Sequence, residues 1–120
     1  MSDTHGHYIT IPGLYVLSDI SAKQYHAVKH ASTADAVVAL GATTNVIAGV
    51  LMDAPDAAGE AATVARLGVV TVVAGTGTLA RGTQIQFDST GRAITASGKT
   101  YGQLLESKSA IGDELRAILY

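Results

Sequence analysis

Thirteen glycines are distributed along the 120 residues, and this spacing constrains the fold more than any other feature of the sequence. An internal glycine costs a helix about 1 kcal/mol relative to alanine, so few segments remain in which a long helix could form. Between the glycines lie short runs rich in Val, Ile and Thr, the residues that favour strands. The sequence therefore predicts a mainly β protein with little helix.

The β-favouring runs predict eight strands. Short strands at this spacing, separated by turn residues, are typical of a small compact β-barrel or β-sandwich. Two helical alternatives remain open, over Ala57–Leu67 and over Asp113–Tyr120. The strands are expected at Lys23–Lys29, Val37–Leu40, Val46–Met52, Ala62–Val73, Thr83–Phe87, Arg92–Thr95, Gly102–Ser107 and Glu114–Leu119.

Some of these strands are apolar on both faces. Gln84–Phe87 alternates polar and apolar residues, as a half-buried strand does, whereas Leu67–Val73 does not alternate, and Ile118 adjoins Leu119. A strand that is apolar on both faces needs cover on both sides. With no long helix expected, a second sheet or a neighbouring subunit must supply that cover. We therefore expect a subunit interface along these strands, formed by Val70, Val72, Arg116, Ile118 and Tyr120.

The first 20 residues differ from the β domain predicted over residues 21–120. Met1–His7 is small and polar, and Tyr8–Leu17 is apolar without regular alternation and is interrupted by Pro12-Gly13. We interpret residues 1–20 as an extended arm that becomes ordered on contact with a partner. Alternatively, the segment is an ordinary first strand of the domain. The expected contact residues of the arm are Tyr8, Ile9, Ile11, Leu14, Tyr15, Val16 and Leu17.

Charge and hydropathy exclude several classes of partner. The formal net charge is −2 and no run of Lys or Arg occurs, so we expect no nucleic-acid partner. The uncharged stretch Ala36–Met52 is interrupted by Thr43, Thr44 and Asn45 and is too polar to cross a membrane. The N-terminus lacks the basic and apolar regions of a signal peptide. We expect a protein that associates with other proteins rather than with a membrane.

No motif predicts catalysis, a cofactor or a metal. Gly75–Ala80 matches the dinucleotide pattern G-x-G-x-x-A, but a strand rather than a helix is expected to follow it. His26 and His30 are four residues apart without an evident third ligand, and the acidic loop Asp53–Glu60 lacks the spacing of a calcium loop. There is no cysteine, no G-x-S-x-G and no H-E-x-x-H. We therefore expect a protein that is not an enzyme and has no catalytic, cofactor-binding or metal-binding residues.

From about Ala34 to the C-terminus, the order of these turns and strands resembles the decoration (cement) proteins of tailed-phage capsids. The resemblance depends on the order of the motifs, since each alone is only a turn with its flanking core positions. Leu105 and Thr83 depart from the family pattern. The matching segments are Ile47–Leu51, Asp56–Ala65, Leu67–Val70, Arg81–Ile85, Asp88–Ile94, Tyr101–Glu106 and Gly112–Leu119.

The resemblance implies a compact β-tulip-like fold and a homotrimer on the outer surface of the capsid. Such a protein is made in the host cytoplasm, binds the major capsid protein of the assembled virion and stabilises the head against internal DNA pressure. In this hypothesis the N-terminal arm lies on the capsid. The alternative function is that of a β-barrel binding module of a fibre or adhesin, which recognises a glycan or a protein.

Overall fold

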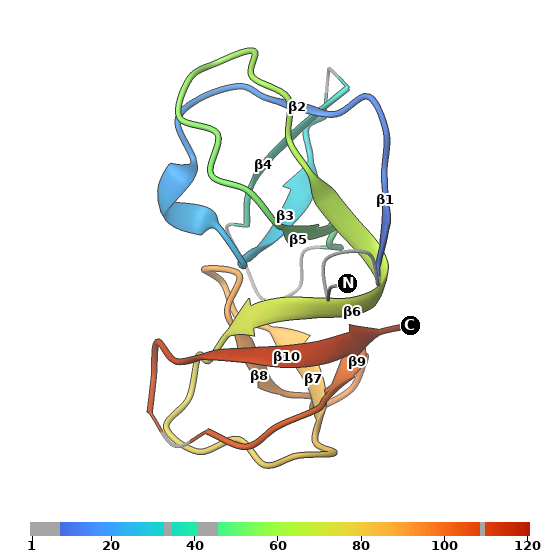
Figure 1. Cartoon of the computed structure of the whole chain (residues 1–120), viewed down its shortest axis with the longest axis vertical. Helices are drawn as coiled ribbons and strands as arrows, with labels where there is room; N and C mark the ends of the chain where they lie inside the picture. The colour runs from blue at the N-terminus through green and yellow to red at the C-terminus, as the bar shows by residue number, and fades with distance from the viewer. Residues whose placement is uncertain (1–7, 33–34, 41–45, 109) are drawn as a thin grey trace, which may run out of the picture.

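The longest strand of the protein, β6 (Val64–Val73), runs through both halves of the molecule (Figure 1). The computed structural model describes residues 8–32, 35–40, 46–108 and 110–120. The other strands are β1 (Tyr8–Thr10), β2 (Tyr15–Val16), β3 (Ala27–His30), β4 (Ala36–Ala39), β5 (Gly49–Leu51), β7 (Gln84–Phe87), β8 (Ala93–Thr95), β9 (Gly102–Leu104) and β10 (Glu114–Leu119); one 3-10 turn, η2, spans Ser21–Lys23.

The strands form one sheet in the order β2-β4-β3-β5-β6-β10-β9-β7-β8, and β1 pairs separately with β6. In Figure 1, β2 to β5 lie around one end of β6, and β7 to β10 lie around the other end. The sheet folds back on itself, so that isolated bridges join Ala74 to Ala93 and Tyr15 to Ala61. These single bridges do not make a continuous ladder. The expected mainly β fold is therefore confirmed as a sandwich-like arrangement, and the barrel is corrected to an unclosed sheet.

Two apolar clusters form the core: the larger extends from β3 and β5 to β7–β10, and the smaller lies around β2 to β5. Facing positions on β6 and β10 supply the centre of the larger cluster, because Val70 is opposite Ala117 and Val72 is opposite Leu115 in the antiparallel register. The smaller cluster is covered by the chain's own N-terminal segment through Leu14, Val16 and Ile20. Its other members are Val28, Val37, Ala48, Leu51, Ala62 and Val64. The chain thus supplies much of the second layer that its doubly apolar strands require.

Each of the eight expected strands overlaps an observed strand, although several are shorter than expected; Gly102–Ser107, for example, ends at Leu104. Both helical alternatives are wrong. In Glu114–Leu119 the buried residues Leu115, Ala117 and Leu119 alternate with accessible ones, which is the period of a strand, and the segment pairs with β6. Within 57–67, the residues from Val64 onward pair with β5 and β1. Among the described residues, no helix is long and apolar enough to cross a membrane.

The first predicted strand begins later than expected. The sequence places it at Lys23–Lys29, but η2 occupies residues up to Lys23 and Tyr25 has a φ of 66°. A left-handed backbone is unfavourable for a residue with a bulky side chain and does not fit a strand. The N–H of Tyr25 donates to the carbonyl of Leu51 at 2.6 Å, which attaches this irregular residue to β5.

The tip of the β7–β8 hairpin connects the two halves of the molecule. Gly91 has a φ of 90°, and its carbonyl accepts a hydrogen bond from the N–H of Ala27 at 2.8 Å. A Cβ atom added to Gly91 would lie 2.5 Å from the carbonyl oxygen of Ala27. Glycine is therefore required here both by backbone conformation and by the close approach of β3.

We predict that Gly91→Ala lowers the free energy of unfolding by at least about 2 kcal/mol, because it combines a left-handed non-glycine residue with a backbone clash. Urea denaturation of the purified protein measures the effect. Gly98→Ala is the matched control, because a Cβ there meets nothing within 4 Å, and it should change stability by less than about 0.5 kcal/mol. Equal stability of the two variants would contradict the proposed link between the halves.

Candidate functional site

The N-terminal segment is hydrogen-bonded into the sheet from Tyr8 onward. β1 is antiparallel to β6, with Tyr8 opposite Gly68 and Ile9 opposite Leu67, and β2 is parallel to β4. The N–H of Ile11 donates to the carbonyl of Val64 at 3.0 Å. The first seven residues of the expected arm lie outside the described part of the chain.

The side chains of the expected arm residues divide between the core and the surface. Leu14 and Val16 are buried in the smaller cluster, and Ile11 packs against it. Tyr8 packs against the larger cluster. Tyr15 is half-buried, whereas Ile9 and Leu17 are 64% and 45% exposed. Contact with a partner stays a prediction, and in this conformation Ile9 and Leu17 offer the most accessible apolar surface for it.

The expected subunit interface also divides between two faces. Val70 and Val72 point into the larger core and are buried. Arg116 and Ile118 occupy the other face of β10 and are partly accessible, and Tyr120 is 53% exposed. Because Leu67–Val73 is apolar at nearly every position, its sequence does not indicate which face of β6 is internal. The pairing of β6 with β10 decides which face is buried.

An apolar stripe that the sequence analysis did not assemble lies on the outer face of β1, β6 and β10. Ile9 is paired with Leu67, which is 41% exposed, and Ile118 is paired with Val69. Paired residues in an antiparallel sheet project from the same face, and alternation along β10 places Tyr120 on the face of Ile118. We call Ile9, Leu67, Val69, Ile118 and Tyr120 the outer stripe. Leu67 and Val69 were missed because their run is apolar at nearly every position.

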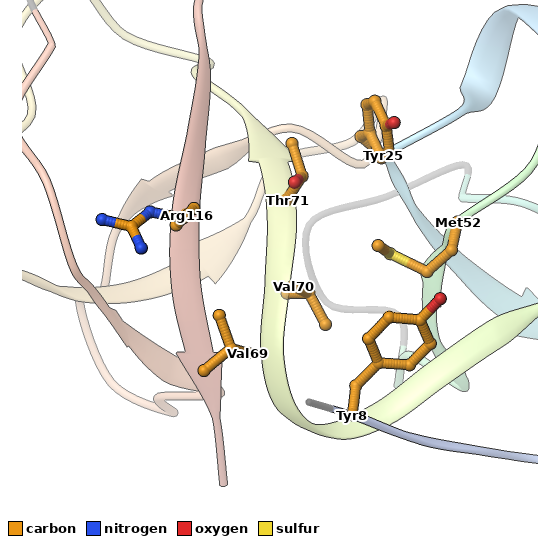
Figure 2. Close-up of a pocket in the computed structure, with 7 residues that line it drawn as sticks. All are labelled: Tyr8, Tyr25, Met52, Val69, Val70, Thr71 and Arg116. Carbon is orange, nitrogen blue, oxygen red and sulfur yellow. The ribbon is translucent and has the colours of Figure 1, made fainter. Parts of the chain in front are cut away.

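A pocket of roughly 160 Å³ opens beside β6 (Figure 2). Its lining comes from β1, β6, β10 and the segments around β5 and β3, and Tyr8, Tyr25 and Met52 lie on the side away from β10. The described lining includes no carboxylate or histidine, so it lacks the nucleophile–base pair that covalent catalysis needs. Its mixed apolar and phenolic surface suits contact with another protein's side chain. The lining residues are Tyr8, Tyr25, Met52, Val69, Val70, Thr71 and Arg116.

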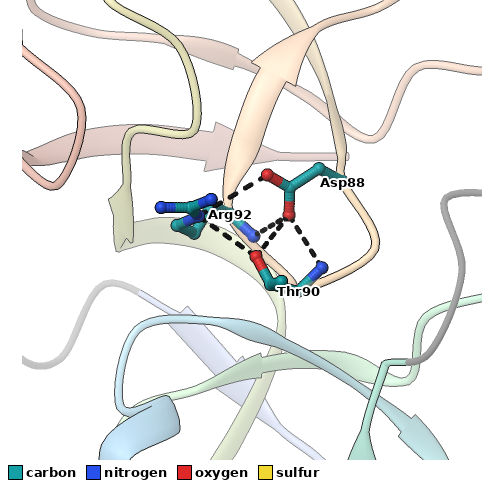
Figure 3. Close-up of polar contacts among 3 residues, drawn as sticks. All are labelled: Asp88, Thr90 and Arg92. Atoms are coloured by element: carbon teal, nitrogen blue, oxygen red, sulfur yellow. Dashed lines mark hydrogen bonds and ion pairs between the residues drawn. The ribbon is translucent and has the colours of Figure 1, made fainter.

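The most connected polar group is the carboxylate of Asp88 in the β7–β8 turn (Figure 3). Oδ1 accepts hydrogen bonds from the N–H of Thr90 at 2.9 Å, the hydroxyl of Thr90 at 2.8 Å and the N–H of Arg92 at 3.0 Å. Oδ2 lies 3.5 Å from Nε of Arg92. Burial alone would raise the pKa of Asp88, but these hydrogen bonds and the nearby cation outweigh it and lower the pKa. This cluster shapes the turn that contacts β3.

The other motifs do not assemble into a reactive site. His26 is half-buried; burial and the neighbouring cations Lys23 and Arg92 lower its pKa, against the opposing hydrogen bond with the Gln24 carbonyl. Across the described ranges, no group of three His, Asp or Glu residues could hold a metal ion. Gly75, the first glycine of the dinucleotide-like motif, donates its N–H to the carbonyl of Ala93. The motif is followed by β7, so no helix N-terminus is available for a pyrophosphate.

Comparison with known families matches residues 20–119 to the phage cement proteins. The chain belongs to the phage cement protein family. The match excludes β1 and β2 and begins at Ile20, earlier than the resemblance that starts at about Ala34. Membership gives the chain a structural, capsid-associated role in a bacteriophage.

The fold is also found in a solved phage structure. The chain matches the N-terminal base of the head fibre protein gp8.5 of bacteriophage phi29 with a TM-score of 0.71, and the match covers 93% of each chain. Sequence identity is 13%, so this likeness concerns the fold alone. No curated protein matches the sequence significantly.

The Asp88 cluster predicts part of the acid sensitivity of the fold. Because the folded-state pKa of Asp88 is lowered, its contribution is present above the unfolded-state pKa of about 3.9 and is lost as the pH falls through the folded-state value. Asp88→Asn should therefore lower stability at pH 7 by about 1 kcal/mol and make the stability profile flatter below about pH 4. Urea denaturation between pH 2.5 and 7 measures both effects.

The matched control is Asp56→Asn, because Asp56 is exposed and its carboxylate accepts no hydrogen bond from the described residues. This variant should reproduce the parent profile. The pKa of Glu106 is also lowered, chiefly by the N–H of Arg116, so Asp88→Asn should retain some acid sensitivity. A parallel decrease of stability at all pH values in Asp88→Asn would contradict the assigned electrostatic role.

Proposed function

We propose that this protein decorates the outer surface of the assembled phage capsid, binds the major capsid protein as a homotrimer and stabilises the shell against internal DNA pressure. The family match over residues 20–119 is the observation that carries the proposal. A protein that binds only the assembled shell stabilises it by mass action, because disassembly would remove the binding site. No chemical step is needed for this role.

The accessible part of the N-terminal segment is the proposed capsid contact. Leu17 is 45% exposed and lies immediately after the buried Val16, so its backbone is fixed to the core while its side chain faces outward. Together with the half-buried Tyr15, it presents apolar surface at a rigid position. One such contact is weak. Three copies in one trimer engage several capsid subunits together, which raises the overall avidity.

A second candidate function is the base of a head fibre or adhesin that recognises a glycan or a protein. The shared fold with the phi29 head fibre base supports it. Both roles place the domain on a phage head, but they differ in the effect on the shell. A decoration protein increases the temperature or pressure at which the shell opens, whereas a binding module leaves that threshold unchanged. Heating purified heads with and without the protein, and measuring DNA release, separates the two.

We predict that Leu17→Asp reduces binding to purified capsids at least about tenfold, because a charge must be desolvated where an apolar side chain was buried. Co-sedimentation with capsids measures binding. Val46→Asp is the matched control, because Val46 is 70% exposed outside this segment. Substitution tests the contact better than deletion of residues 1–17, which would also remove Leu14 and Val16 from the core. Unchanged binding of a folded Leu17→Asp protein would reject the proposed contact.

A further inference from the structure

Two exposed apolar surfaces lie at opposite ends of β10. The outer stripe, with Ile118 and Tyr120, is at its C-terminal end. Ile111, which is 60% exposed, lies on the turn that precedes its N-terminal end. β10 has six residues and is therefore about 20 Å long, and Figure 1 shows the preceding turn and the C-terminus on opposite sides of the molecule. One molecule therefore cannot cover its own stripe with its own Ile111.

Two arginines lie beside the outer stripe, and they differ in their charge partners. Arg66 directly precedes Leu67, and its Nη1 atom is buried without a hydrogen-bond partner. Arg116 shares the outer face with Ile118; its Nε atom binds Glu106 at 3.1 Å, and its side chain remains 56% exposed. Within the described ranges, the two ion pairs are Arg92–Asp88 and Arg116–Glu106. Arg66 therefore has no carboxylate partner there.

The turn at Ile111 has the opposite charge. Asp113 and Glu114 follow Ile111 directly, Glu114 is exposed, and neither carboxylate belongs to those two ion pairs. Gly112, with a φ of 92°, makes the turn tight, so that Ile111 projects from it. The turn thus combines one protruding apolar side chain with two carboxylates, which complements an apolar stripe next to Arg66, the arginine that lacks a carboxylate partner among the described residues.

We propose that these surfaces bind each other between neighbouring copies: Ile111 of one copy packs on the outer stripe of the next, and Asp113 and Glu114 face its Arg66. The two surfaces are different, so the contact is head-to-tail, and a head-to-tail contact forms a closed ring when its rotation closes. The ring size of three rests on the proposed function; the pairing of the two surfaces does not. The contact covers the accessible outer face of β6 with a second copy of the chain.

A mixing experiment tests the proposal directly. Leu67→Asp disrupts the outer stripe on which Ile111 of a second copy would pack. Ile111→Asp removes the apolar side chain that would pack there. Each single variant should sediment as a monomer, with self-association about 100-fold weaker than in the parent. An equal mixture of the two variants should form a 1:1 dimer and nothing larger, because each retains one half of the contact. Leu17→Asp is the control and should keep the parent's oligomeric state while losing capsid binding.

Sedimentation equilibrium with circular dichroism distinguishes the outcomes. A closed parent oligomer, two folded monomeric variants and a heterodimer in the mixture would support the proposal. A monomeric parent protein would overturn it, as would an Ile111→Asp variant that associates like the parent. If the protein is a monomer and Leu67→Asp abolishes its binding to capsids, the capsid and not a second copy covers the outer stripe. This result would also overturn the proposal. An oligomer that does not bind capsids would leave this pairing intact and refute the proposed function instead.

Discussion

Strand β6 belongs to both halves of the molecule, and the need to cover it along its whole length determines the rest of the fold. Its first residues lie between β5 and β1, and its last six pair with β10. Burying apolar area contributes roughly 25 cal/mol per Å², and a chain with one Phe and no Trp has few large side chains with which to do so. The N-terminal segment supplies part of the cover, and the outer stripe remains accessible.

A local irregularity changes the direction of this strand. Gly68 has a φ of 100°, and the register between β1 and β6 shifts between Ile9 and Thr10. An extra residue in one strand bends it and increases its twist. The bend allows β6 to leave the half that contains β5 and enter the half that contains β10. The outer stripe forms at this bend, where β1 and β10 both meet Gly68.

The resulting surface suits a protein that acts by adhesion. The described part of the chain presents apolar and charged side chains on short strands and turns rather than a cleft with converging reactive groups. The segments that connect to partners in our proposals, around Leu17, Leu67 and Ile111, lie on different faces or ends of the domain. In our proposals, contact with the shell and contact between copies therefore use separate surfaces.

The sequence by itself determined the strands, their turns and the family. Glycine spacing and β-branched runs act locally, and the expected strand Glu114–Leu119 has the bounds of β10. Only the tertiary structure decided which face of Leu67–Val73 is buried, because every position there is compatible with a core. It also decided that Leu14 and Val16 belong to the core, and that the sheet remains unclosed. Those outcomes depend on pairing between residues far apart in the chain, and no local preference encodes it.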